Sequence, residues 1–163
     1  MCIRDSGKSS LLASITSANP KIANYKFTTL NPNLGVTIYD DKEITLADIP
    51  GLIEGAHTGT GLGIKFLKHI ERCKSLLHLI DITENNLEES YNQVRNELGE
   101  YSSDLLKKDE LIVLNKIDLL DEIEVNEKVK NFKKKTKKNV LLLSTLRKDA
   151  LMKVKAKLIN YVS

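Results

Sequence analysis

The chain has 163 residues, of which 41% are hydrophobic and 29% are charged, and its formal net charge is +3. This balance is typical of a single folded soluble domain and excludes an intrinsically disordered chain. No apolar run approaches the ~18 residues that a membrane-spanning helix needs. The two cysteines, Cys2 and Cys73, are too few for a disulfide framework, and neither has a Cys or His at metal-ligand spacing. A reducing, cytoplasmic setting is therefore expected.

Strand-like and helix-like apolar patterns alternate along the chain, which is typical of an α/β fold with a mostly parallel sheet. The sequence predicts a helix after Gly7-Lys8-Ser9 that passes Ile15 and gives way to a loop near Asn19-Pro20. Strands at 35–39 and 44–47 flank a polar turn, so they are expected to be antiparallel. Apolar residues recur at helical spacing over 66–70, which predicts a helix there. The other predicted elements are a strand at 76–82, a helix from 87 to about 106, a strand at 111–114, a helix at 125–132, a strand at 140–143 and a helix at 151–162.

A phosphate-binding motif opens the chain. Gly7-Lys8-Ser9-Ser10 matches the second half of G-x-x-x-x-G-K-[ST], in which backbone N–H groups cradle phosphates and the lysine reaches the β- and γ-phosphates. The first glycine of the pattern would fall at Cys2. Taken alone, the tripeptide is a weak signal, and an ordinary helix start with a serine near its cap is then the favoured interpretation.

Two further motifs offer oxygen ligands for magnesium. Asp48-Ile49-Pro50-Gly51 ends a predicted strand, where the aspartate can hold Mg²⁺ through water and the glycine N–H can face a γ-phosphate. Phe27-Thr28-Thr29 can supply a threonine hydroxyl to the same ion. The alternative for residues 48–51 is a plain turn after a strand.

Residues 115–118, Asn-Lys-Ile-Asp, end another apolar strand and predict a guanine site. The Asp118 carboxylate can accept from the N1–H and the exocyclic amine of guanine, whereas adenine has an acceptor at N1. Asn115 can tie this loop to the phosphate loop, and the stem of Lys116 can lie over the base. Ser144-Thr145-Leu146 follows the last strand and is placed to give a backbone N–H to the guanine carbonyl. Together the motifs favour one nucleotide site at the carboxyl edge of the sheet.

The chain resembles the Obg family of P-loop GTPases in NYKFTTLNPNLGV at 24–36, ADIPGLIEGAH at 47–57 and GLG at 61–63, and HIER at 69–72 resembles its bacterial or organellar branch. The resemblance implies a P-loop NTPase fold, in which a mostly parallel sheet with one antiparallel strand pair is flanked by helices. It implies that Ser9 and Thr29 ligate Mg²⁺. The expected nucleotide-binding residues are Gly7, Lys8, Ser9, Ser10, Phe27, Thr28, Thr29, Asp48, Ile49, Pro50, Gly51, Asn115, Lys116, Asp118, Ser144, Thr145 and Leu146.

Residues 1–6, MCIRDS, depart from that family, whose loop reads roughly G-F-P-N-A-G-K-S. They lack the pattern of a secretory signal and resemble read-through of adapter DNA, so we expect them to be non-native. Asp5 would also place a negative charge near the phosphates. A strand should lead into Gly7, and we expect this first central strand to be missing. Residues 7–163 are then expected to form an N-terminally truncated G domain, without the family's glycine-rich N-terminal domain or a C-terminal extension.

The expected function is GTP and GDP binding with slow GTP hydrolysis, as a monomeric switch in ribosome assembly or translation that contacts the large ribosomal subunit. Leu52 stands where small GTPases have a water-orienting glutamine, so potassium, a ribosomal surface or another segment would have to accelerate hydrolysis. One rival is an ATPase, against which Asp118 argues. A second is a non-hydrolysing ribosome- or RNA-binding module, for which the basic run at 128–138 is the main support, although a solvated helix face is the favoured interpretation of that run. A third is a fragment that does not fold.

Overall fold

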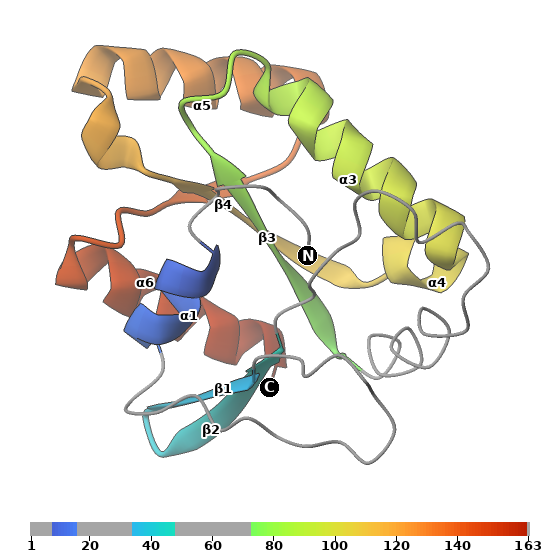
Figure 1. Cartoon of the computed structure of the whole chain (residues 1–163), viewed down its shortest axis with the longest axis vertical. Coiled ribbons are helices and arrows are strands. Elements are labelled where there is room, and N and C mark those ends of the chain that lie inside the picture. The colour runs from blue at the N-terminus through green and yellow to red at the C-terminus, as the bar shows by residue number, and fades with distance from the viewer. Residues whose placement is uncertain (1–7, 16–33, 48–72, 163) are drawn as a thin grey trace.

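The structure, a computed structural model, describes residues 8–15, 34–47 and 73–162 (Figure 1). The predicted strand before Gly7, the loop near Asn19-Pro20 and the predicted helix at 66–70 lie outside the described residues. In chain order the elements are α1 (Lys8–Ile15), β1 (Leu34–Tyr39), β2 (Lys42–Ala47), β3 (Ser75–Asp81), α3 (Leu87–Tyr101), α4 (Ser103–Leu106), β4 (Asp109–Asn115), the 3-10 helix η1 (Ile117–Leu119), α5 (Glu122–Thr136), β5 (Val140–Leu142) and α6 (Lys148–Val162).

Strands β1 and β2 form the predicted antiparallel pair, with a register that runs from Leu34 opposite Ala47 to Tyr39 opposite Lys42. The two turn residues, Asp40 and Asp41, have φ of 53° and 58°. Two successive positive φ angles are the conformation of a type I′ turn, whose twist matches that of the flanking strands. Aspartate tolerates this left-handed region better than most residues.

Strands β3, β4 and β5 form a parallel sheet in that order. β3 pairs with β4 from Ser75 opposite Asp109 to Asp81 opposite Asn115. With the antiparallel pair, this sheet confirms the α/β class and the mostly parallel topology. The observed strand ends lie within two residues of the predicted ones.

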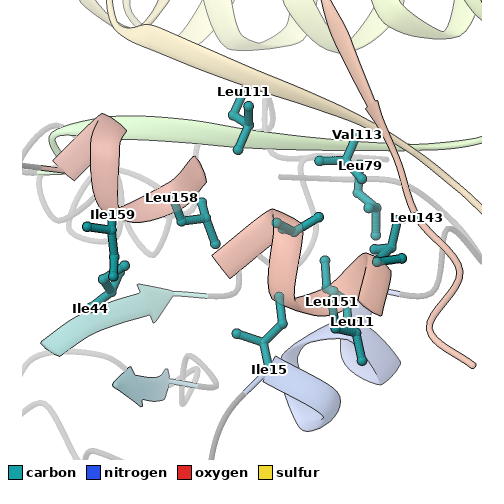
Figure 2. Close-up of a cluster of buried hydrophobic side chains, with 12 residues drawn as sticks. Leu11, Ile15, Ile44, Leu79, Leu111, Val113, Leu143, Leu151, Leu158 and Ile159 are labelled. Atoms are coloured by element: carbon teal, nitrogen blue, oxygen red, sulfur yellow. The ribbon is translucent and has the colours of Figure 1, made fainter. Parts of the chain in front are cut away.

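Helices cover both faces of the parallel sheet (Figure 1). On one face α1 and α6 pack with residues that include Leu79 and Val113, and Figure 2 shows this core. On the other face the core cluster joins Ile80 and Ile112 of the strands to residues of α3 and α5, including Phe132. Consecutive strand residues are therefore buried on opposite sides, which explains why these strands are almost continuously apolar.

The single helix predicted from 87 to about 106 is wrong, because the chain forms two helices there. Ser102 is extended, with φ −159° and ψ 124°, and it ends α3. Its hydroxyl accepts a hydrogen bond from the Asp104 N–H (3.3 Å) and so caps the start of α4. A serine hydroxyl that competes for backbone donors in this way favours a helix boundary over a helix interior. The break lets Leu105 point into the core, where it is fully buried.

Helix α5 is longer than the predicted 125–132. Asp121 accepts a hydrogen bond from the Glu124 N–H (2.8 Å) and caps its start, and the left-handed Lys137 ends it. α6 likewise begins three residues before the predicted 151. None of the helices in the described ranges is long and apolar enough to cross a membrane.

Candidate functional site

The carboxyl ends of β3, β4 and β5 meet at one edge of the parallel sheet. Backbone hydrogen bonds continue past the ends of the strands: Ile82 N–H donates to Asn115 O (3.0 Å), Leu143 N–H to Leu114 O (2.8 Å) and Ile117 N–H to Leu143 O (3.3 Å). These bonds fix the loops after the three strands against one another. The structure thus brings the predicted 115–118 and 144–146 segments together.

The segment after β4 changes direction sharply at Lys116. Asn115 is buried, Lys116 is left-handed with φ 64° and ψ 33°, and η1 follows directly. A left-handed residue other than glycine costs about 1 to 2 kcal/mol, so the surrounding contacts must hold this turn. Asp118 emerges from the turn with its side chain exposed. Its carboxylate is therefore accessible to a ligand at this edge.

The segment after β5 forms a compact turn around Ser144. The Ser144 side chain is fully buried, and its hydroxyl accepts a hydrogen bond from the Leu146 N–H (3.3 Å). Arg147 N–H donates to the Ser144 carbonyl (3.0 Å), which leads the chain toward α6. Thr145 is half-buried and Leu146 is exposed.

Asp81, at the end of β3, belongs to this edge although the sequence analysis gave it no role. Its Oδ2 lies 2.6 Å from Lys116 Nζ. Its Oδ1 accepts from the Thr83 N–H (2.9 Å) and the Thr83 hydroxyl (2.7 Å). Burial raises the pKa of Asp81, but the hydrogen bonds from Lys116 and Thr83 outweigh burial and hold this pKa below its ordinary value. The sequence offers one indication of a role for Asp81, which is its position as a single carboxylate at the end of an apolar strand.

Lys128 of α5 stabilises the loop after β3 through hydrogen bonds. Its Nζ donates to the carbonyls of Ile82 and Glu84, each at 2.8 Å. The basic run at 128–138 is therefore not a uniformly solvated face, because its first lysine is half-buried and structural. Its other lysines are exposed, and among them Lys135 pairs with Glu88 at 2.9 Å.

Helix α1 begins at Lys8, as the phosphate-binding motif predicts. The side chains of Lys8 and Ser9, together with Gly7 and the motifs at 27–29 and 48–51, lie outside the described residues, and Ser10 is exposed. Thr37 of β1 donates its hydroxyl hydrogen to the Ile15 carbonyl (2.8 Å), which fastens the end of α1 to the strand pair. Within the described ranges, no three His, Cys, Asp or Glu side chains could hold a metal ion together.

Residues 3–116 match a family model described as 50S ribosome-binding GTPase. The chain is 71% identical over 159 residues to GTPase Obg of Pelagibacter ubique, an alignment that covers 98% of this chain and 49% of that protein. The chain belongs to the Obg family. GTPase Obg of Rickettsia massiliae is 53% identical over 150 residues, with 92% of this chain and 46% of that protein covered. This Obg-family chain thus spans about half the length of the curated relatives it matches.

Solved structures support the fold. The G domain of the T. maritima FeoB iron transporter superposes with a TM-score of 0.67 at 21% identity, covering 98% of this chain and 93% of that one. At this identity the likeness extends to the fold alone. It agrees with the α/β class and the mostly parallel sheet described above.

Proposed function

We propose that this Obg-family chain binds GTP and GDP and hydrolyses GTP slowly, as a monomeric cytoplasmic switch in ribosome assembly or translation. The observation that carries the proposal is the meeting of the 115–118 and 144–146 segments at one sheet edge, with the Asp118 carboxylate exposed. An exposed acceptor beside a buried, hydrogen-bonded loop suits recognition of the N1–H and exocyclic amine of guanine. A backbone N–H of the 144–146 segment complements the guanine carbonyl.

The phosphate half of the proposed site is assigned to Gly7, Lys8, Ser9 and Ser10 at the start of α1. A helix N-terminus carries unpaired N–H groups and a partial positive charge, both of which favour phosphate. The proposed γ-phosphate segment is 48–51, and Phe27 and Thr28 flank the nucleotide beside Thr29.

Magnesium is the proposed cofactor, held by the hydroxyls of Ser9 and Thr29 and, through water, by Asp48. This donor set consists entirely of oxygen, which is the ligand type that Mg²⁺ prefers, so the residues fit the ion. When bound, the ion neutralises charge on the β- and γ-phosphates. Potassium is a second candidate cofactor.

Slow hydrolysis follows from Leu52, which directly succeeds the 48–51 motif. A leucine side chain can neither orient water nor accept a proton. Without a partner we expect turnover no faster than the ~10⁻⁴ to 10⁻³ s⁻¹ of unassisted small GTPases. Leu52→Ala should change this rate little in single-turnover assays.

A second candidate function is a ribosome- or RNA-binding module that does not hydrolyse nucleotide. The exposed lysines in the second half of α5 and just after it favour it, because clustered cations on one surface attract nucleic-acid phosphates. The large ribosomal subunit is the proposed partner in either case. Single-turnover GTP hydrolysis with and without ribosomes separates the two functions, since only a GTPase gains rate.

The decisive experiment is isothermal calorimetry of the full-length protein with GDP and with ADP, each in the presence of magnesium. A site whose polar groups become buried beneath the bound base can reject a mismatched ligand by ~10⁴-fold or more, so GDP should bind far more tightly than ADP. Equal affinities would refute guanine recognition by the 115–118 loop.

A further inference from the structure

Asp81 and Lys116 connect two neighbouring strands at the edge that carries the proposed guanine site. We propose that Asp81 is a positioning residue that sets the guanine-recognition loop by holding Lys116, and this inference rests on the proposed function. The Asp81 Oδ2 to Lys116 Nζ distance is 2.6 Å, and the side chains are 11% and 31% exposed. Both groups are thus largely withdrawn from water, where a charge pair is stronger than at an open surface.

The Asp81 carboxylate is held by hydrogen bonds other than the one with Lys116. Its Oδ1 accepts two hydrogen bonds from Thr83, which leaves Oδ2 turned toward Lys116. The strand register also places Asp81 directly opposite Asn115, the residue before the lysine. Because Thr83 holds one oxygen and the strand register places the residue next to β4, the Asp81 carboxylate acts as a rigid anchor for Lys116.

Lys116 needs such an anchor because of its backbone. Its left-handed conformation turns the chain from β4 into η1 and so determines where Asp118, two residues later, emerges. Without Asp81 the lysine ammonium would gain hydration by rotating outward, since a lysine stem has several free bonds and a strongly hydrated head. Both the stem over the base and the turn that presents Asp118 would then lose their support.

The loop that follows Asp81 is braced in turn by α5. Lys128 Nζ donates to the Ile82 and Glu84 carbonyls, and Glu84 N–H donates to the Asp81 carbonyl (3.2 Å). The anchor therefore lies at the start of a segment that α5 holds through Lys128, by hydrogen bonds that do not involve the Asp81 carboxylate. Loss of the carboxylate should leave this brace intact and affect the base-binding half of the site specifically.

The test is Asp81→Asn in the full-length protein, with dissociation constants for GDP and ADP measured by competition against a fluorescent GDP analogue. Because the substitution removes a charge-assisted hydrogen bond to Lys116, the variant should bind GDP about tenfold more weakly than the wild type. ADP makes no use of the guanine loop, so its weak binding should not change. A fall in the ratio of GDP to ADP affinity is the readout that a merely structural role of Asp81 would not give.

Matched variants sharpen the test. Lys116→Met should weaken GDP binding, and adding Asp81→Asn to it should weaken binding little further, because the pair acts as one unit. Asp81→Glu keeps the charge and should recover most of the affinity. Asp104→Asn removes a carboxylate of α4 that lies 2.7 Å from Lys107 Nζ, and it should leave both affinities unchanged.

Some results would overturn the inference. A folded Asp81→Asn protein with wild-type GDP affinity refutes it, as does an equal loss for GDP and ADP. If Asp81→Asn does not fold, Thr83→Val removes one hydrogen bond to Oδ1 but keeps the carboxylate. It should weaken GDP about threefold with ADP unchanged, and unaltered GDP binding would then refute the anchor. Wild-type protein without guanine preference would instead refute the proposed function, and the inference with it.

Discussion

Glu110 of β4 joins β3 to α3 through a buried carboxylate, and its removal should be among the most destabilising changes in this domain. The side chain is 4% exposed. Its Oε1 lies 3.0 Å from His78 Nδ1, and its Oε2 accepts from the Tyr91 hydroxyl (3.0 Å). Arg95 lies 3.6 Å from the same Oε2 and donates to the Leu106 carbonyl (2.9 Å), which extends the network to α4.

The expected cost follows from what Glu110→Ala would leave behind. His78 is 2% exposed, and the Tyr91 ring stacks on it at 5.3 Å between centroids. Both side chains would keep their burial and lose their acceptor, while Arg95 would lose its counter-charge. Leaving a buried hydrogen-bonding group without its partner costs about 1 to 3 kcal/mol of unfolding free energy for each group. Glu110→Gln retains an acceptor and should cost about 1 to 2 kcal/mol.

The cost of Glu110→Gln should depend on pH with a defined sign. Burial raises the pKa of Glu110, but the hydrogen bonds from His78 and Tyr91 and the nearby Arg95 charge outweigh it and hold this pKa below its ordinary 4.5. A group with a depressed pKa stabilises the fold above its unfolded pKa and loses that contribution as pH falls through the folded value. The unfolding free energies of the wild type and of Glu110→Gln should therefore differ most at about pH 7 and become equal well below pH 4.5.

Urea unfolding of the full-length protein provides the assay, with the transition of this domain identified by its shift on addition of GDP. Asp104→Asn is the control, because Asp104 is an exposed carboxylate whose loss should not move the midpoint measurably. A Glu110→Ala midpoint equal to that of the wild type would show that the network adds nothing to stability. A Glu110→Gln deficit that persists unchanged in acid would show that the charge of Glu110 is not its source.

Two further predictions concern the loops at the carboxyl edge. Asp118→Asn should weaken GDP binding and strengthen binding of xanthosine diphosphate, because an amide can donate to the extra carbonyl of xanthine; competition binding measures both, and unchanged GDP affinity would count against the assigned role. Lys128→Met keeps the apolar stem but removes both hydrogen bonds to the loop after β3. Amide exchange at Glu84 should then report an opening free energy lower by about 1 to 3 kcal/mol, and an unaltered rate would show that α5 does not brace this loop.

Much of the fold could be predicted because strands buried on two faces have an unmistakable apolar pattern. The stretch at 76–82 becomes β3 almost residue for residue, and the polar turn at 40–41 becomes a tight reversal. The break at Ser102 could not be predicted in the same way. The apolar spacing of α3 passes through it, and the boundary is set by the extended backbone of Ser102 and the hydrogen bond from the Asp104 N–H to the Ser102 hydroxyl.

The residues of the site that belong to one sequence motif could be predicted, whereas contacts that depend on the register between strands could not. Asn115 and Asp118 are the first and fourth residues of one four-residue motif, so spacing alone predicts a shared site. The partnership of Asp81 with Lys116 needs two strands side by side in parallel, a left-handed turn at the lysine and a threonine that orients the carboxylate. The parallel sheet was predicted, but neither the left-handed turn at Lys116 nor the orienting role of Thr83 was predicted from the sequence.

The two ends of the parallel sheet show how a structural polar group differs from one that faces a ligand. Near the amino end of β4, both oxygens of Glu110 accept hydrogen bonds from within the domain, and the side chain is shut off from water. At the carboxyl end, Asp81 is likewise committed to Thr83 and Lys116, whereas Asp118, two residues after Lys116, is exposed. A carboxylate with internal partners stabilises a conformation, and an exposed one on a rigid turn can bind without first breaking such bonds. Asp81 therefore fits positioning, and Asp118 fits contact with the base.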